Sequence, residues 1–192
     1  TAAKLALFLS TAEGHRGLRK ARRAVRQVLD GAESPRECVA MMLLTLPYLM
    51  GGNAVSKPAL NVPIELTPRQ QVRFGRSSVR CDAIWRDVGL ALEYESDAFH
   101  SGQRAFVRDS KRRNDLRLLG IDVVTMTNEE LKSRDSTAKI ADAIVARCGQ
   151  RRGVAPGDLP AKQRRLRRLL LDRRLRQGAA HVIESDGDAF AR

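Results

Sequence analysis

The sequence predicts an α/β protein in which a mixed central sheet is flanked by helices, in the order α-β-β-β-α-β-α, with basic helical extensions. Three observations lead to this prediction. The two-residue period of a strand over residues 89–95 sets Leu90, Leu92 and Tyr94 on one face and Ala91, Glu93 and Glu95 on the other, so that one face is apolar and the other carries two acids. Residues 103–119 have the length of a helix and end at a glycine, and the apolar run 121–126 then follows as a buried strand. A strand, a helix and a parallel strand in succession require one right-handed crossover, so the sheet is expected to be mixed.

The segments before this unit favour two helices. Residues 16–29 carry apolar side chains at helical spacing with basic residues on the other side, and Asp30-Gly31 ends the pattern. Residues 34–37, Ser-Pro-Arg-Glu, form a helix start, with serine as the N-cap, proline in the first turn and glutamate as the capping-box partner. This second helix is expected to continue to Leu46.

Proline, glycine and alternation predict the remaining elements. Residues 53–69 contain three prolines and indicate an extended connection with room for an edge strand at 60–66. A closing helix is expected at 136–148. The three expected strands that precede the crossover helix are 71–74, 79–85 and 89–95.

Positive charge is concentrated at the two ends of the chain. The net charge is +13; residues 1–30 hold seven basic and two acidic side chains, and residues 151–178 hold ten and two, whereas residues 31–150 are nearly balanced. Three parts are therefore expected. They are a basic N-terminal helical segment (1–30), a central domain (31–150), and a linker with a basic, leucine-striped helix and a loose acidic end (151–192).

The expected partner of the basic segments is duplex DNA. Clustered lysine and arginine bind phosphate backbones by releasing condensed counterions. Aromatic residues make up only 4% of the chain, so a stacking platform for single strands is not expected. Solvated faces without a ligand remain an alternative, and an anionic membrane is a weaker one because neither basic run is flanked by Trp or Phe. The side chains expected to bind nucleic acid are Arg19, Arg22, Arg23, Arg104, Arg108, Arg112, Arg164, Arg165 and Arg168.

Several classes of protein are disfavoured by what the sequence lacks. It contains neither a run of 18 apolar residues nor a signal-peptide pattern, so a cytoplasmic location is expected and a membrane partner is not. Cys38, Cys81 and Cys148 are far apart and lack zinc-ligand spacing, so they are expected to be reduced and buried. A glycine-rich phosphate loop, a nucleophilic triad and a nucleotide fingerprint are also missing.

Acidic side chains are expected to meet on two neighbouring strands. In the last of the three strands, Glu93 and Glu95 are expected on one face and the leucines on the other. In the strand before it, Asp82 is expected on the same face as Ile84 and opposite Cys81. A hairpin between the strands would bring Asp82 close to Glu93, where a divalent cation would relieve the repulsion between carboxylates. Pairing with arginines on a solvated sheet is the alternative.

An ordered set of motifs runs through residues 78–126. An aspartate in one strand is followed by an acidic-x-acidic strand, a histidine, a helix rich in Arg and Asp, and a hydrophobic strand. In this sequence the motifs are residues 81–85, 92–97, 99–100, 108–114 and 120–127, with a matching helix start at 32–37. In this order they resemble a group of uncharacterised bacterial proteins related to very-short-patch-repair endonucleases, within the PD-(D/E)XK nuclease superfamily. The resemblance covers about residues 31–148 and is carried by the combination rather than by any one motif.

The resemblance implies a restriction-endonuclease-like core and a metal-dependent DNA endonuclease that hydrolyses phosphodiester bonds with Mg²⁺ or Mn²⁺. The ion would polarise a non-bridging oxygen and lower the pKa of the attacking water. Asp82 and Glu93 would hold the metal, and Glu37 is a candidate third carboxylate beside its role in the helix start. The lysine of the superfamily would fall at position 95, where this chain has Glu95, so the charge that orients the water or stabilises the pentavalent phosphorus lacks an evident source.

The other catalytic candidates lie between that strand and the next one. His100 is a candidate general base or leaving-group partner. Lys111, together with Arg108 and Arg112 one helical turn apart, is a candidate for a cation that has migrated from position 95. Some relatives follow a winged helix and act as antitoxins of type IV toxin–antitoxin systems, whereas others look like free nucleases.

Two further functions stay open at this point. The first is a DNA-binding or antitoxin module that keeps the nuclease fold without hydrolysis, which would account for Glu95. The second is a structural adaptor that binds a partner protein through the leucine-striped helix near the C-terminus.

Overall fold

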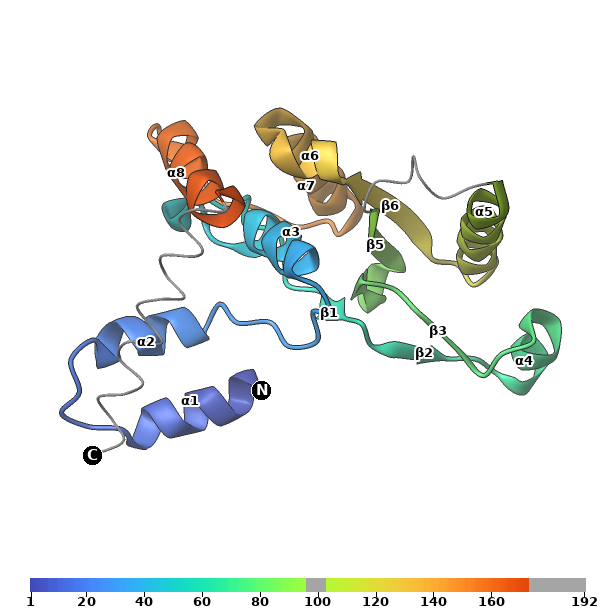
Figure 1. Ribbon diagram of the computed structural model, residues 1–192, viewed down its shortest axis with the longest axis horizontal. Helices are drawn as coiled ribbons and strands as arrows, with labels where there is room; N and C mark the ends of the chain where they lie inside the picture. Colours follow the sequence, from blue (N-terminus) through green and yellow to red (C-terminus); the bar gives the residue numbers. More distant parts are fainter. Residues whose placement is uncertain (96–102, 173–192) are drawn as a thin grey trace.

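The structure, a computed structural model, describes residues 1–95 and 103–172 and confirms a mixed α/β fold with a central mixed sheet flanked by helices (Figure 1). The sheet has four strands in the order β1-β4-β5-β6. β4 is antiparallel to β1 and β5, whereas β5 and β6 run parallel, with α5 (Gln103–Leu118) between them in the sequence. The strand bounds are β1 Ala59–Leu60, β4 Ala83–Trp85, β5 Leu90–Glu95 and β6 Asp122–Thr127.

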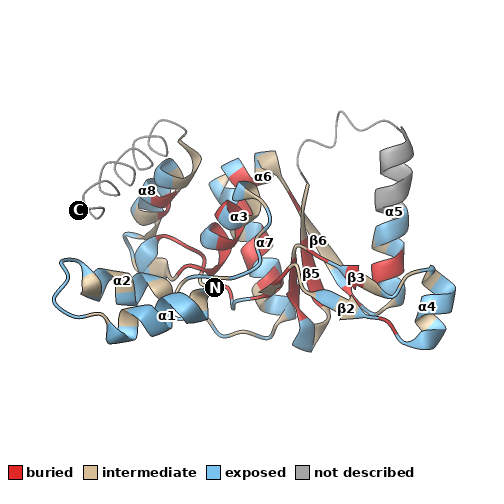
Figure 2. Ribbon diagram, turned by 60° about the horizontal axis from the view of Figure 1, so that its bottom comes forward, coloured by how far each residue is buried: buried red, intermediate tan, exposed pale blue. Residues whose placement is uncertain are grey.

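One face of this sheet carries the larger core. The helices on this side are α3 (Pro35–Thr45), α7 (Arg134–Arg147) and α8 (Leu159–Leu171). α3 contacts β5, α7 and α8, and its inner side chains meet Ala83, Leu92 and Met126, which are fully buried. Buried segments of α3, α7 and the strands are drawn in red in Figure 2. The leucine stripe of α8 joins this core through the buried Leu166.

The opposite face has a smaller core beneath α5. Cys81, Ile84 and Ala91 from the strand region pack there with Leu116 of α5 and with Ile121. The expectation that Cys81 and Ile84 lie on opposite faces is therefore wrong. The expected strand 79–85 is interrupted, because β3 ends at Arg80 and β4 begins at Ala83. Strict alternation does not continue through the two residues between them.

A second, two-stranded sheet lies between β1 and β4 in the sequence. β2 (Pro63–Glu65) and β3 (Ser78–Arg80) are antiparallel, and α4 (Pro68–Phe74) connects them. The expected strand at 71–74 is wrong, since these residues belong to α4. A capping box between Thr67 and Gln70 starts this helix, and Pro68 is at its first turn, where its missing N–H is harmless.

Two helices precede this body at the N-terminus. α1 (Ala2–Thr11) and α2 (Leu18–Val25) pack against each other, and α2 is shorter than the helix expected at 16–29. α1 was not predicted. The guanidinium of Arg22 donates to the carbonyl oxygens of Leu9, Ser10 and Ala12, at the end of α1, with N···O distances of 2.7, 3.3 and 2.9 Å. The remaining short elements are η1 Tyr48–Met50, η2 Arg86–Val88 and α6 Asn128–Lys132.

Candidate functional site

Asp82 lies at the break between β3 and β4 and is held by two hydrogen bonds, one from Asn61, which follows β1, and one from Tyr94 of β5. Its backbone carbonyl accepts the amide of Asn61 at 3.1 Å, and its Oδ2 accepts the amide of Tyr94, on β5, at 2.7 Å. The register that pairs Ala83 with Leu92 brings Asp82 level with Glu93 when it is extended by one residue. The expected proximity of Asp82 and Glu93 thus follows from the pairing of β4 with β5.

Glu93 lies on the β5 face that α5 covers and is largely buried, with 14% of its side chain exposed. Its Oε1 accepts from Nη2 of Arg112 at 2.8 Å. The same guanidinium donates to the carbonyl of Arg80 at 2.7 Å, so it also ties α5 to the end of β3. Arg112 was expected to contact nucleic acid or to replace the missing lysine, and in this structure its first partner is a carboxylate.

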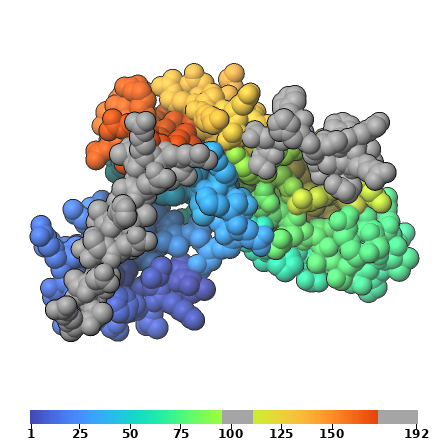
Figure 3. All heavy atoms as spheres, in the orientation of Figure 1, coloured from blue at the N-terminus to red at the C-terminus, as the bar shows by residue number. Residues whose placement is uncertain are grey.

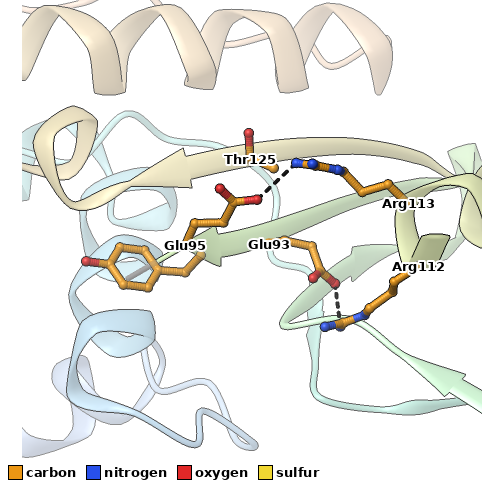
Figure 4. Close-up of a pocket in the computed structure, with 6 residues that line it drawn as sticks. Glu93, Glu95, Arg112, Arg113 and Thr125 are labelled. Atoms are coloured by element: carbon orange, nitrogen blue, oxygen red, sulfur yellow. Dashed lines mark hydrogen bonds and ion pairs between the residues drawn. The ribbon is translucent and has the colours of Figure 1, made fainter. Parts of the chain in front are cut away.

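Glu95 follows on the same face and forms a second ion pair. Its Oε1 accepts from Nη1 of Arg113 at 3.1 Å, and both side chains are about one-third exposed. Figure 4 shows the two arginines reaching from α5 toward the two glutamates on β5. A pocket of about 170 Å³ lies here, lined by Glu93, Tyr94, Glu95, Arg112, Arg113 and Thr125.

Burial and mutual repulsion shift the pKa values of the two inner carboxyl groups. Burial, and then the negative charges of Asp82 and Glu95, raise the pKa of Glu93 to about 7, although the positive charge of Arg112 acts to lower it. Burial and the charge of Glu37 raise the pKa of Asp82, against the lowering effects of the Tyr94 amide and nearby arginines. The raised pKa values of Glu93 and Asp82 therefore come first from burial and then from the neighbouring carboxylates.

The pKa values of two further groups, Cys81 and Glu37, are also shifted. Burial, and then the negative charge of Glu93, raise the pKa of the Cys81 thiol to about 12, which keeps this thiol protonated. For Glu37, burial acts to raise the pKa, but hydrogen bonds from Glu33, Ser34 and Asn61 lower it below its ordinary value.

Glu37 has a structural task in α3. Its backbone N–H donates to Oγ of Ser34 at 3.1 Å, and its Oε2 accepts from the amide of Glu33 and from Nδ2 of Asn61, both at 2.9 Å. The expected N-cap at Ser34 and the proline in the first turn are thereby confirmed, and the carboxylate of Glu37 holds the amide of Glu33. Glu37 is close enough to raise the pKa of Asp82, and its role as a metal ligand stays a prediction.

Among residues 1–95 and 111–172, whose side chains the structure describes, no three or more His, Cys, Asp or Glu side chains are grouped so that they could hold a metal ion. Asp82 and Glu93 offer two carboxylates. Mg²⁺ is commonly bound through one or two protein carboxylates, with water and substrate phosphates completing the octahedron. The donor pair fits such an ion in number and in chemistry.

The structure describes the remaining candidates of the site only in part. His100 lies outside the described residues. Arg104 and Arg108 belong to α5, but their side chains lie outside the described part. Lys111 is exposed and forms no ion pair with a described carboxylate.

The sequence reasoning missed Arg113. A signal was present, because Arg112 and Arg113 precede the apolar Leu116 by four and three residues and therefore share its helix face. If Leu116 is assigned to the buried face of this helix, both arginines lie on that face as well and point toward β5.

The basic extensions are partly used by the fold itself. Arg19 and Arg23 are exposed on α2, whereas Arg22 holds the end of α1. Arg164, Arg165 and Arg168 are exposed on α8, beside Arg167, which donates to the carbonyls of Leu131 and Lys132. DNA binding by the exposed arginines stays a prediction. In the described part of the chain, no helix is both long and apolar enough to cross a bilayer.

Comparison with known proteins gives a narrow result. The chain is 29% identical over 119 residues to the uncharacterised proteins MT2308 and Rv2248 of two Mycobacterium tuberculosis strains. The match covers 62% of this chain and 39% of each relative, so the chain spans well under half of the relatives it matches. No family model matches the sequence, and no solved structure matches it.

Proposed function

We propose that this chain is a metal-dependent DNA endonuclease with a restriction-endonuclease-like core of the PD-(D/E)XK type. The observation that carries the proposal is the pair of partly buried carboxylates, Asp82 directly before β4 and Glu93 on the neighbouring strand β5, whose charges repel. The strand order β1-β4-β5-β6, with α5 between the two parallel strands, supports the same proposal. Perturbed carboxyl pKa values beside a polar pocket are typical of functional sites.

The chemistry follows from the donor set. Asp82 and Glu93 would hold Mg²⁺ or Mn²⁺, which supplies Lewis acidity toward a phosphate oxygen and a lowered pKa for bound water. Asp82 is already oriented by the Tyr94 amide, so its position does not depend on the ion. Arg112 is neutralised by Glu93 at present, and a cation at Glu93 would free its guanidinium to contact phosphate oxygens.

Plasmid nicking in the presence of Mg²⁺ or Mn²⁺ tests the proposal. Wild type should cleave, chelation should stop cleavage, and Asp82→Asn and Glu93→Gln should each reduce it to background. Asp122→Asn is the matched control, because Asp122 is an exposed carboxylate on β6 that pairs with Arg147 outside the pocket. Cleavage that survives in the Asp82 and Glu93 variants, or that is missing in wild type, would contradict the proposal.

One observation favours a second candidate, a DNA-binding module that does not hydrolyse. Glu93 and Glu95 are both in ion pairs, with Arg112 and Arg113, and such pairing compensates carboxylate charge without a metal. This candidate predicts no heat of Mg²⁺ binding by calorimetry, and DNA binding that Asp82→Asn leaves unchanged. The endonuclease predicts Mg²⁺ binding that Asp82→Asn abolishes.

A further inference from the structure

The segment from β2 through α4 to β3, residues 63–80, forms an arm on the second sheet, and we call it the hairpin arm. In Figure 3 its atoms, in green, lie at the opposite end of this face from α1 and α2. Residues 63–80 contain Arg69, Arg73, Arg76 and Arg80 against one acidic residue, Glu65. The arm is therefore a local concentration of positive charge outside the two basic ends of the chain.

The tip of the arm is exposed. Leu66 and Val79 are buried at its base, in the smaller core, whereas α4 has no buried residue. Arg69 and Arg73 are exposed and four residues apart, so they share one face of α4, and Val72 between them is 88% exposed. Neither arginine forms an ion pair with a carboxylate in the described part of the chain.

The arm is held in place although its tip buries little. The capping box of Thr67 and Gln70 fixes the start of α4, and Gly75, with φ of 66°, ends the helix in a left-handed conformation that glycine adopts without strain. Arg76 then forms an ion pair with Asp115 of α5, whose side chain is only 11% exposed. This pair joins the arm to α5, the helix that also carries the pocket residues Arg112 and Arg113.

We infer that the hairpin arm is a contact surface for duplex DNA, with Arg69 and Arg73 on backbone phosphates beside the pocket. An exposed pair of arginines on a helix that carries no Asp or Glu complements a polyanion, and the helix that holds both side chains is already ordered before binding. Single strands fit less well because Phe74 is the one aromatic residue of α4, is partly buried and has the guanidinium of Arg73 5.5 Å from its ring, so α4 offers no row of exposed rings on which successive bases could stack. The inference rests on the proposed function only for its choice of DNA as the polyanion.

Duplex binding measured by fluorescence anisotropy in EDTA tests the arm without cleavage. Arg69→Ala/Arg73→Ala should weaken binding about tenfold or more at 0.1 M salt and reduce the slope of log K against log salt by about 2, since each lost phosphate contact removes about 0.9. The matched control is Lys132→Ala/Lys139→Ala, which removes the same charge from exposed positions of α6 and α7, next to the other face of the sheet. The control should keep the wild-type slope, and thermal unfolding should be unchanged in both.

Each other result has a defined meaning. Equal weakening in the arm variant and the control would reduce the effect to net charge and overturn the inference, as would wild-type binding by the arm variant. Single-stranded DNA that competes better than duplex would also overturn it. If wild type does not bind duplex at all, the arm and the DNA partner of the proposed function fail together. If the arm variant loses affinity while wild type shows no metal-dependent nicking, DNA binding by the hairpin arm is supported and the endonuclease proposal is contradicted.

Discussion

The two faces of the central sheet are covered in different ways, and β5 shows the difference residue by residue. Leu90 and Leu92 point into the larger core under α3, where their side chains are fully or almost fully buried. On the other face Ala91 lies in the smaller core, but the next two positions are Glu93 and Glu95, which meet arginines of α5. The face under α5 thus changes from apolar to ionic along a single strand.

The apolar face of the sheet stabilises the fold, whereas the face under α5 holds the groups that could do chemistry. Burying apolar surface under α3 and α7 stabilises the fold at any pH. Burying carboxylates under α5 opposes folding at neutral pH, because the charged form loses hydration and repels its neighbours. A chain that keeps such groups on one face while the other face supplies the core has a region whose charges are available for binding or catalysis.

The largest expected effect comes from the apolar face. Leu92→Ala should lower the free energy of unfolding by roughly 3–5 kcal/mol, because Leu92 is 0% exposed and its truncation leaves a cavity in the larger core. Denaturant unfolding followed by circular dichroism measures this difference. Leu169→Ala, at a position of α8 that is 49% exposed, should change stability by less than about 0.5 kcal/mol. Equal losses in the two variants would show that the larger core does not carry the stability assigned to it.

The carboxyl groups under α5 should make the free energy of unfolding depend on pH. The pKa of Glu93 is raised from 4.5 to about 7 in the folded protein, so the folded state binds the proton more tightly than the unfolded state. The stabilisation that the folded state gains from binding this proton is therefore complete below about pH 4.5 and is lost as the pH rises through 7. The expected decrease is on the order of 2–3 kcal/mol between pH 5 and pH 8, measured by denaturant unfolding in EDTA.

Glu93→Gln isolates this contribution, because glutamine has the same shape and does not titrate. The difference in stability between wild type and Glu93→Gln should change with pH over this window, and the variant should be the more stable protein at pH 8. Asp122→Asn, at an exposed carboxylate that pairs with Arg147 outside the pocket, is the control substitution. A difference between wild type and Glu93→Gln that does not vary with pH would mean that burial does not perturb Glu93.

The sequence predicted the face of β5 correctly because this strand is unbroken over six residues, so alternation alone assigns Glu93 and Glu95 to one side. The same rule failed at Cys81, since the chain leaves β3 for β4 within two residues and changes sheet. Local alternation carries no information on where a strand changes its partner.

The errors in the helices have a similar cause. Pro68 was counted with the prolines of an extended connection, although a proline directly after Thr67 also starts a helix when Gln70 completes the capping box. Arg22 was assigned to DNA, because α1 was not predicted and the carbonyl groups that Arg22 binds could not be foreseen. Arg113 was missed because the helix was recognised by its length and glycine stop, without fixing which side faces the sheet.

The smallest expected effect distinguishes the two ion pairs within the ionic face. A double-mutant cycle on Arg112 and Glu93 at pH 8 should give a coupling energy of about 1–2 kcal/mol, because Glu93 is 14% exposed and its charge has little access to water. The same cycle on Arg113 and Glu95 should give less than about 1 kcal/mol, since these side chains are 37% and 31% exposed and water screens the pair. Raising the salt concentration should reduce the second coupling more than the first. The opposite order would place the stronger electrostatic coupling at the outer pair and move the centre of the site from Glu93 to Glu95.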